Sequence, residues 1–185
     1  FLNASDNLFF KVSPFIYILS RITRKKLYIR MFGGCFDLTY QKQIKFIKIF
    51  LRYTTFKSDA LFVETNLQLN FIKSYFLNKD RLYKFPNCRK FVKFGSDKPS
   101  HPFVFIGQIK KEKGLDFIIK ANELLSDNQK IHVYGPLWNK IYRNKLEDTY
   151  KGILKNEDVL RTIEKYKYLV LPTYWYGEGH PGIII

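Results

Sequence analysis

The strongest constraint on the fold of this chain is the repeated alternation of short apolar runs and amphipathic stretches. Strand-like runs occur at residues 27–32, 60–63, 82–85, 103–106, 130–134, 150–154 and 168–171, and most of them stop at glycine or proline. Helical patterns occur at residues 14–25, 41–53, 67–76, 114–125, 138–146 and 156–166. Strands that alternate with helices pair in parallel through right-handed crossovers. The sequence therefore predicts the α/β class with mostly parallel sheets.

A polar, basic stretch from Asn87 to Ser100 separates two sets of these elements. It is the best candidate for a linker, so we expect one partial domain at residues 1–97, including the linker, and a second at residues 98–185. Two complete domains of this kind need about 300 residues. The chain begins at Phe1 and ends on three isoleucines, and we expect it to be an internal fragment truncated at both ends.

The charge of the chain is strongly positive. Lys and Arg number 32 against 16 Asp and Glu, a net charge of +16, while 46% of the residues are hydrophobic. The hydrophobic share excludes wholesale disorder. The charge has two explanations that the sequence leaves open: an anionic partner such as a membrane surface, phosphorylated ligands or nucleic acid, or a background bias toward lysine.

One helical pattern carries the same ambiguity. In residues 41–53, Lys42, Lys45, Lys48 and Arg52 share one face, and Ile44, Ile47 and Leu51 share the other. Such a helix fits an anionic membrane surface, and it fits equally an ordinary core-packed helix with a solvated basic face. The longest early apolar run, residues 15–19, is far below the ~20 residues of a membrane span.

Two loops that follow strands of the second half are candidates for ligand binding, because ligands of open α/β sheets bind beyond the carboxyl ends of the strands. The first runs from Gly107 to Gly114 and holds three lysines. A helix that begins near Gly114 would direct backbone N–H groups at an anion. Taken alone, this loop fits a solvated basic turn better than a binding site.

The second loop runs from Pro172 to Gly182 and combines three aromatic residues, three glycines and Glu178. Packing alone does not explain this composition. A carboxylate such as Glu178 is a strong acceptor for sugar hydroxyls. Backbone N–H groups near Pro181 suit a phosphate or a sugar.

Together, residues 107–116, the Val133-Tyr134-Gly135 turn and the loop at residues 172–182 resemble family 4 (group 1) glycosyltransferases. Residues 30–34 and 85–87 are similar to members that build bacterial surface polysaccharides. The resemblance implies a GT-B-like fold of two Rossmann-like domains, both incomplete here. It also implies a retaining, hexosyltransferase-type enzyme that uses a nucleotide-sugar donor.

The resemblance carries over to particular residues. Lys113 would stabilise the leaving diphosphate and Glu178 would contact the donor sugar. The remaining expected donor-binding residues are Gly107, Gln108, Lys110, Lys111, Gly135, Gly179, His180, Pro181 and Gly182, and Gly33 and Gly34 form the candidate acceptor-side loop. Gln108 stands where the family usually has arginine, so Lys110 or Lys111 is expected to supply the missing charge.

Two parts of the family pattern are missing. The second glutamate would fall one residue beyond Ile185, and the loop at Gly33 and Gly34 has no histidine. No Asp-x-Asp-type metal clamp is present, so we expect neither a cofactor nor a metal.

Our first functional hypothesis is transfer of a sugar to a growing glycan or a lipid-linked saccharide in cell-surface polysaccharide synthesis. The expected place is the cytoplasm, with peripheral attachment to the inner face of the membrane, and we expect the fragment by itself to be inactive. A basic module for single-stranded nucleic acid is the alternative, ranked lower because the basic residues are dispersed and no RNP-like or KH pattern occurs. An inactive remnant of a glycosyltransferase is the third.

Overall fold

The computed structural model describes residues 1–76, 79–88, 98–137, 141–178 and 183. The chain divides into two compact units. The first unit comprises Phe1–Arg89 and Tyr176–Ile185, and the second unit comprises Lys90–Trp175. The expected boundary at residue 97 falls outside the described residues and stays a prediction.

The first unit is built on a fully parallel sheet in the order β1-β2-β3-β4. Its strands are β1 (Leu2–Ala4), β2 (Tyr28–Met31), β3 (Ala60–Val63) and β4 (Leu82–Lys84). Ile29 pairs with Leu61, which pairs with Leu82, and this row packs into the core. The neighbouring row of Arg30, Phe62 and Tyr83 points to the other face, because side chains alternate along a strand.

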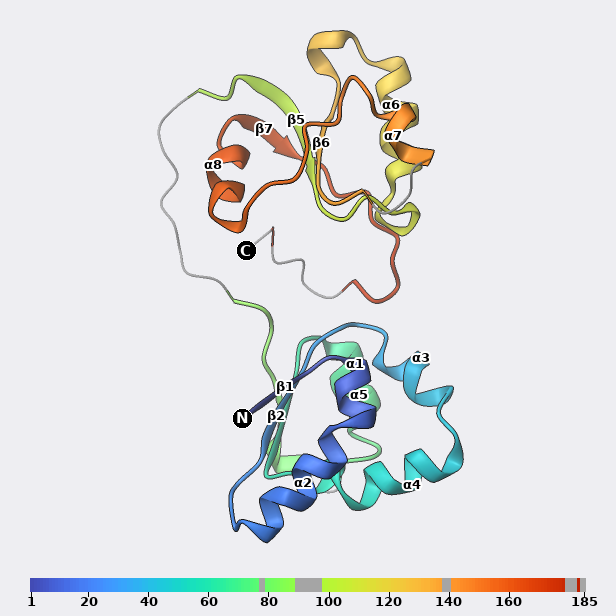
Figure 1. Ribbon diagram of the computed structural model, residues 1–185, viewed down its shortest axis with the longest axis vertical. Helices are drawn as coiled ribbons and strands as arrows, with labels where there is room; N and C mark the ends of the chain where they lie inside the picture. Colours follow the sequence, from blue (N-terminus) through green and yellow to red (C-terminus); the bar gives the residue numbers. More distant parts are fainter. Residues whose placement is uncertain (77–78, 89–97, 138–140, 179–182, 184–185) are drawn as a thin grey trace. The chain divides into compact units, whose positions relative to one another are not determined.

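Short helices pack against the core-facing row of this sheet. They are α1 (Asp6–Lys11), α2 (Ser13–Ile22), α3 (Phe36–Gln41), α4 (Lys45–Tyr53) and α5 (Asn66–Ile72), with 3-10 turns at Thr55–Lys57 and Lys79–Arg81. Figure 1 shows α1, α3, α4 and α5 on one side of the sheet. The core between helices and sheet is rich in phenylalanine: the rings of Phe10 and Phe36 stack at 5.3 Å, and Phe9 meets Phe36 edge to face at 5.0 Å.

The second unit has a parallel sheet in the order β6-β5-β7. The strands are β5 (His101–Ile106), β6 (His132–Tyr134) and β7 (Tyr166–Leu169), and the helices are α6 (Leu115–Leu124), α7 (Ile141–Lys145) and α8 (Val159–Ile163). Three 3-10 turns lie at Lys111–Lys113, Asp127–Gln129 and Asn156–Asp158. In Figure 1, α6 and α7 cover one face of this sheet and α8 covers the other. Such two-sided coverage is typical of parallel sheets.

The expected α/β class with parallel sheets is confirmed, and several element boundaries are wrong. The helix expected at residues 41–53 begins only at Lys45, as α4, because the backbone of Ile44 is extended; Gln41 is the last residue of a separate helix, α3. The helix expected at residues 156–166 begins as a 3-10 turn at Asn156–Asp158 and ends at Ile163. At residues 150–154 only an isolated bridge between Val133 and Tyr150 forms. Strand β1 and helix α1 have no counterpart in the expectations.

None of the helices in the described part of the chain is long and apolar enough to span a bilayer.

Candidate functional site

The loops that follow β5 and β6 lie side by side at the carboxyl edge of the second sheet. The N–H of Gly107 donates to the carbonyl of Tyr134 at 3.0 Å, and the N–H of Ile109 donates to the carbonyl of Pro136 at 3.1 Å. Gly135 has a φ of +144°, and a Cβ built there would collide with the carbonyl oxygen of Gly107. Only glycine allows this close approach of the two backbones.

The loop that follows β7 contacts residues 107–114, the loop after β5, which we call the lysine-rich loop. Gly114 adopts a left-handed conformation with a φ of +79°, and a Cβ there would collide with the carbonyl oxygen of Pro172. The N–H of Tyr174 and the hydroxyl of Thr173 donate to the carbonyl of Glu112 at 3.1 and 3.3 Å. The turn Lys111–Lys113 and the start of α6 are thus held against the β7 loop. The structure therefore brings the loops after β5, β6 and β7 together.

Basic side chains line a hollow beside this junction. Its volume is about 400 Å³, and its lining consists of Ile109, Lys110, Lys111, Glu112, Asp116, Ile141, Tyr142 and Lys145. The hydroxyl of Tyr142 donates to Asp116 at 3.1 Å. Burial, together with the neighbouring Asp116 carboxylate, raises the pKa of Tyr142 to about 12, so this phenol stays protonated near neutral pH.

The structure places the predicted residues of this loop in different environments. Lys110, Lys111 and Gln108 are exposed, whereas Lys113 is half-buried beside Gly114. Asp116, Tyr142 and Lys145 were not predicted as site residues. Asp116 lies two residues after Gly114 in the sequence, and that proximity was the available signal. Tyr142 and Lys145 reach the hollow only through the tertiary placement of α7.

Part of the predicted set lies elsewhere. Gly179, His180, Pro181 and Gly182 lie outside the described residues. Glu178 is half-buried and belongs to the first unit, so its expected cooperation with Lys113 stays a prediction.

The predicted acceptor-side loop, Gly33 and Gly34, follows β2 at the carboxyl edge of the first sheet. Gly33 has a φ of +98°, its N–H donates to the carboxylate of Glu64 at 3.4 Å, and its carbonyl accepts from the Gln68 amide. A Cβ on Gly34 would collide with the backbone of Gly177. Both glycines are therefore required by geometry, whatever ligand this edge binds.

Two carboxylates that sequence reasoning missed also lie at this edge. Glu64 directly follows β3, is only 6% exposed, and lies 4.0 Å from the guanidinium of Arg30. Asp6 follows β1 and accepts a hydrogen bond from Thr39 at 3.1 Å, and burial raises its pKa. In the described part of the chain, one oxygen of each carboxylate is buried without a hydrogen-bond partner. Their positions directly after strands were the signal, but β1 itself was not predicted.

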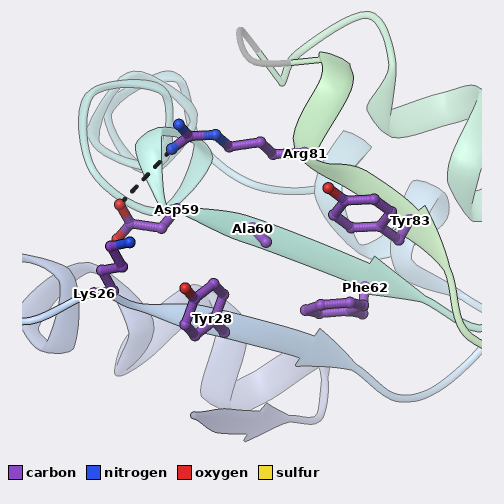
Figure 2. Close-up of a pocket in the computed structure, with 7 residues that line it drawn as sticks. All are labelled: Lys26, Tyr28, Asp59, Ala60, Phe62, Arg81 and Tyr83. Atoms are coloured by element: carbon purple, nitrogen blue, oxygen red, sulfur yellow. Dashed lines mark ion pairs between the residues drawn. The ribbon is translucent and has the colours of Figure 1, made fainter.

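A second hollow of about 430 Å³ lies on the uncovered face of the first sheet, near the starts of β2, β3 and β4. Figure 2 shows Tyr28, Phe62 and Tyr83 along the strands, with Lys26, Asp59 and Arg81 at one end. The Asp59 carboxylate already has partners within the protein. It accepts hydrogen bonds from Arg21 and from the N–H of Leu27, each at 2.7 Å, and lies 3.9 Å from Arg81. This hollow lies near the amino ends of the strands, whereas ligands of such sheets bind beyond the carboxyl ends. We therefore assign it no function.

The histidines of the second unit have a structural role. His101 lies in β5, and its ring stacks on that of His132 at 3.7 Å. Burial lowers the pKa of His132 to about 4, helped by nearby His101 and Lys151. Among the residues that the structure describes, no group of three His, Cys, Asp or Glu side chains is placed to hold a metal ion. Metal independence itself stays a prediction.

Solved structures share this fold. The structure of TarM matches with a TM-score of 0.59 at 18% identity, covering 84% of this chain and 33% of that one. An S. aureus TarM mutant in complex with fondaparinux, alpha-GlcNAc-glycerol and UDP matches with a TM-score of 0.58 at 19% identity, covering 80% of this chain and 32% of that one. The likeness confirms the GT-B-like fold class, and the chain spans about a third of the length of these structures. No family model and no curated protein matches the chain.

Proposed function

We propose that this chain is part of a glycosyltransferase that takes a sugar from a nucleotide-sugar donor and transfers it to a saccharide acceptor in cell-surface glycan synthesis. The observation that carries the proposal is the junction of the loops after β5, β6 and β7, where Gly107 meets Gly135 and Gly114 meets Pro172 beside three lysines. The fold that the chain shares with TarM supports it, because the TarM mutant structure contains UDP and a GlcNAc-bearing glycerol.

The donor's diphosphate fits the lysine-rich loop. Gly107 and Gly135 keep side chains away from the strand ends, so the backbone N–H groups can approach phosphate oxygens closely. Lys113, with Lys110 and Lys111, neutralises the charge that builds up on the leaving diphosphate as the bond between it and the sugar breaks. Glu178 accepts hydrogen bonds from the sugar hydroxyls. The acceptor's hydroxyl oxygen forms the new bond to the sugar carbon, and the hydroxyl proton passes to the departing diphosphate.

Finer features of the proposal rest on the sequence resemblance alone. They are membership of family 4 (group 1), hexosyl transfer with retention of the anomeric configuration, a lipid-linked acceptor, and independence from metal ions. The match covers only about a third of the length of the solved structures that share the fold. We therefore expect the 185-residue chain to bind the donor's nucleoside diphosphate without completing the transfer.

The test is calorimetric titration of the chain with UDP, GDP and ADP in the presence of EDTA. We expect binding of at least one of them, weakened about tenfold or more in Lys113→Ala, because a charge-assisted hydrogen bond contributes about 1.5–3 kcal/mol. Lys120→Ala is the matched control, since Lys120 is exposed on α6 and is not part of the lysine-rich loop. The control should bind like the wild type.

Two outcomes would contradict the proposal. One is the absence of binding to any of the three diphosphates, and the other is equal binding by wild type and Lys113→Ala. Binding to single-stranded DNA that is stronger than binding to the diphosphates, and that weakens with salt, would favour the nucleic-acid alternative.

A further inference from the structure

Helix α2 presents an apolar stripe to the outside of the first unit. Phe15, Ile18, Leu19 and Ile22 are 62%, 40%, 54% and 74% exposed, and their i, i+3, i+4, i+7 spacing places them on one face. The core side of the same helix carries Ser13, Pro14 and Ser20, all buried, and half-buried Ile16 and Tyr17. The more apolar face of α2 therefore points away from the core.

Helix α4 has a second stripe of the same kind. Ile44, Phe46, Ile49 and Tyr53 are 65%, 72%, 45% and 62% exposed, while Ile47 and Leu51 pack into the core. Ile44 is exposed, so the expectation that it shares one face with Ile47 and Leu51 is wrong.

The two stripes form one surface. The ring of Phe50 in α4 lies 5.9 Å from that of Phe15 in α2 and 6.3 Å from that of Phe46. Figure 1 shows α2 and α4 at the same end of the first unit. We call this surface the α2–α4 patch; it consists of Phe15, Ile18, Leu19, Ile22, Ile44, Phe46, Ile49 and Tyr53.

Positive charge surrounds the α2–α4 patch. Arg24, Lys25 and Lys26 follow the end of α2, Lys42 precedes α4, and Lys45 and Arg52 lie on α4; all six are exposed. Residues 7–36 and 38–58 contain no aspartate or glutamate. Asp59, an acidic side chain that pairs with α2, is neutralised by Arg21 at 2.7 Å. An exposed apolar surface of this extent marks an interaction site, and its predominantly cationic border selects an anionic partner.

We propose that the α2–α4 patch docks the first unit onto the surface of an anionic lipid bilayer. The two helices lie in the plane of the interface, with their apolar stripes at the boundary between headgroups and acyl chains and their cations against lipid phosphates. A second copy of the chain fits the patch less well, because it would bring two cationic borders together. The proposal is independent of donor binding by the second unit, so either can fail without the other.

The test is co-sedimentation of the chain with vesicles of phosphatidylcholine alone and of phosphatidylcholine with about 30% phosphatidylglycerol. We expect binding to the anionic vesicles about tenfold or more stronger than to the neutral ones, and weaker at about 0.5 M salt than at about 0.1 M. Phe46→Ser with Ile49→Ser, and separately Lys45→Glu with Arg52→Glu, should each reduce binding about tenfold.

Matched controls separate this surface from a general effect of composition. Leu124→Ser with Lys120→Glu makes the same kinds of change on exposed positions of α6 and should leave vesicle binding unchanged. Circular dichroism of every variant establishes that it is folded. The single variant Phe46→Trp provides a second readout of vesicle binding that also detects weak binding. Its tryptophan emission should shift to shorter wavelength with anionic vesicles only.

The proposal is overturned if anionic vesicles do not bind, if neutral vesicles bind equally, or if the α6 control loses as much binding as the patch variants. A dimer in sedimentation velocity that Phe46→Ser dissociates would assign the patch to a second copy of the chain instead.

Discussion

His132 illustrates at the scale of one residue how burial couples a side chain to stability. Its ring stacks on His101, its Nδ1 lies 2.8 Å from the hydroxyl of Tyr166, and burial lowers its pKa from 6.5 to about 4. The unfolded chain therefore takes up a proton before the folded chain does. The free energy of unfolding is therefore unaffected by His132 titration above pH 6.5, and it decreases as the pH falls from 6.5 toward 4.

We predict that the free energy of unfolding of the second unit decreases between pH 6.5 and 4, and that His132→Phe reduces this decrease. Phenylalanine retains a flat ring against His101 and does not titrate. Urea unfolding monitored by tryptophan fluorescence measures the effect, because Trp175 belongs to the second unit. An identical pH profile in the variant would show that other groups account for the dependence.

Gly114 and Gly152 both have positive φ, but only Gly114 is crowded. Gly152, at φ +95°, has nothing within 4 Å of a built Cβ, whereas at Gly114 the carbonyl of Pro172 occupies that space. We predict that Gly152→Ala costs about 1 kcal/mol, from backbone strain alone, and that Gly114→Ala costs about 3 kcal/mol. The same urea unfolding measurement compares the two. Equal losses would mean that the β7 loop moves aside without cost.

At the scale of elements, α5 depends on a reciprocal cap. The hydroxyl of Thr65 accepts from the N–H of Gln68 at 3.2 Å, and the amide oxygen of Gln68 accepts from the N–H of Thr65 at 3.1 Å. Gln68 also donates to the carbonyl of Gly33. The start of α5 thus supports the glycine loop at the carboxyl edge of the first sheet.

We predict that Thr65→Ala destabilises the first unit by about 1 kcal/mol, the usual effect of losing an N-cap hydroxyl. Thr65→Ser retains the hydroxyl and should recover most of the loss. Urea unfolding followed by circular dichroism checks both variants. A serine variant as unstable as the alanine variant would show that the methyl group of Thr65, and not the cap, is responsible.

At the scale of the whole molecule, each unit has its own core. The first core includes Phe9, Ile29 and Leu61, and the second includes Phe105, Ile118 and Val133; no residue belongs to both. Two separate cores provide two separate sources of stability.

We predict that Phe9→Ala, which empties a fully buried site at a cost of about 3–5 kcal/mol, accelerates amide hydrogen exchange in β1, β2 and β3 and leaves β5 and β6 unchanged. Val133→Ala should have the opposite pattern. Exchange measured by mass spectrometry resolves the two units. Acceleration throughout the chain by either variant would show that the units unfold together.

The sequence predicted most of the strands and helices that depend on interactions between residues close together in the chain. The strand Ala60–Val63 occurs as expected, because four apolar residues lie between Asp59 and Glu64. The helix expected at residues 67–76 begins within one residue of the expected start, because the cap at Thr65 involves residues only three apart in the sequence. The three-residue strand Leu2–Ala4 was missed because it exists through pairing with Tyr28–Met31, about 27 residues away in sequence. Because this strand was not predicted, Asp6, which follows it, was not predicted to lie at the carboxyl edge of the first sheet.

The sequence alone determined the α/β class and the strand-end position of the glycine and lysine loops, since periodicity and turn chemistry act over a few residues. Only the tertiary structure decided which groups meet: Tyr142 with Asp116, Glu112 with Tyr174, and Glu64 with Arg30. It also decided that the apolar stripes of α2 and α4 face outward. Periodicity shows that a helix has an apolar face, but which face the core covers depends on how the neighbouring elements pack.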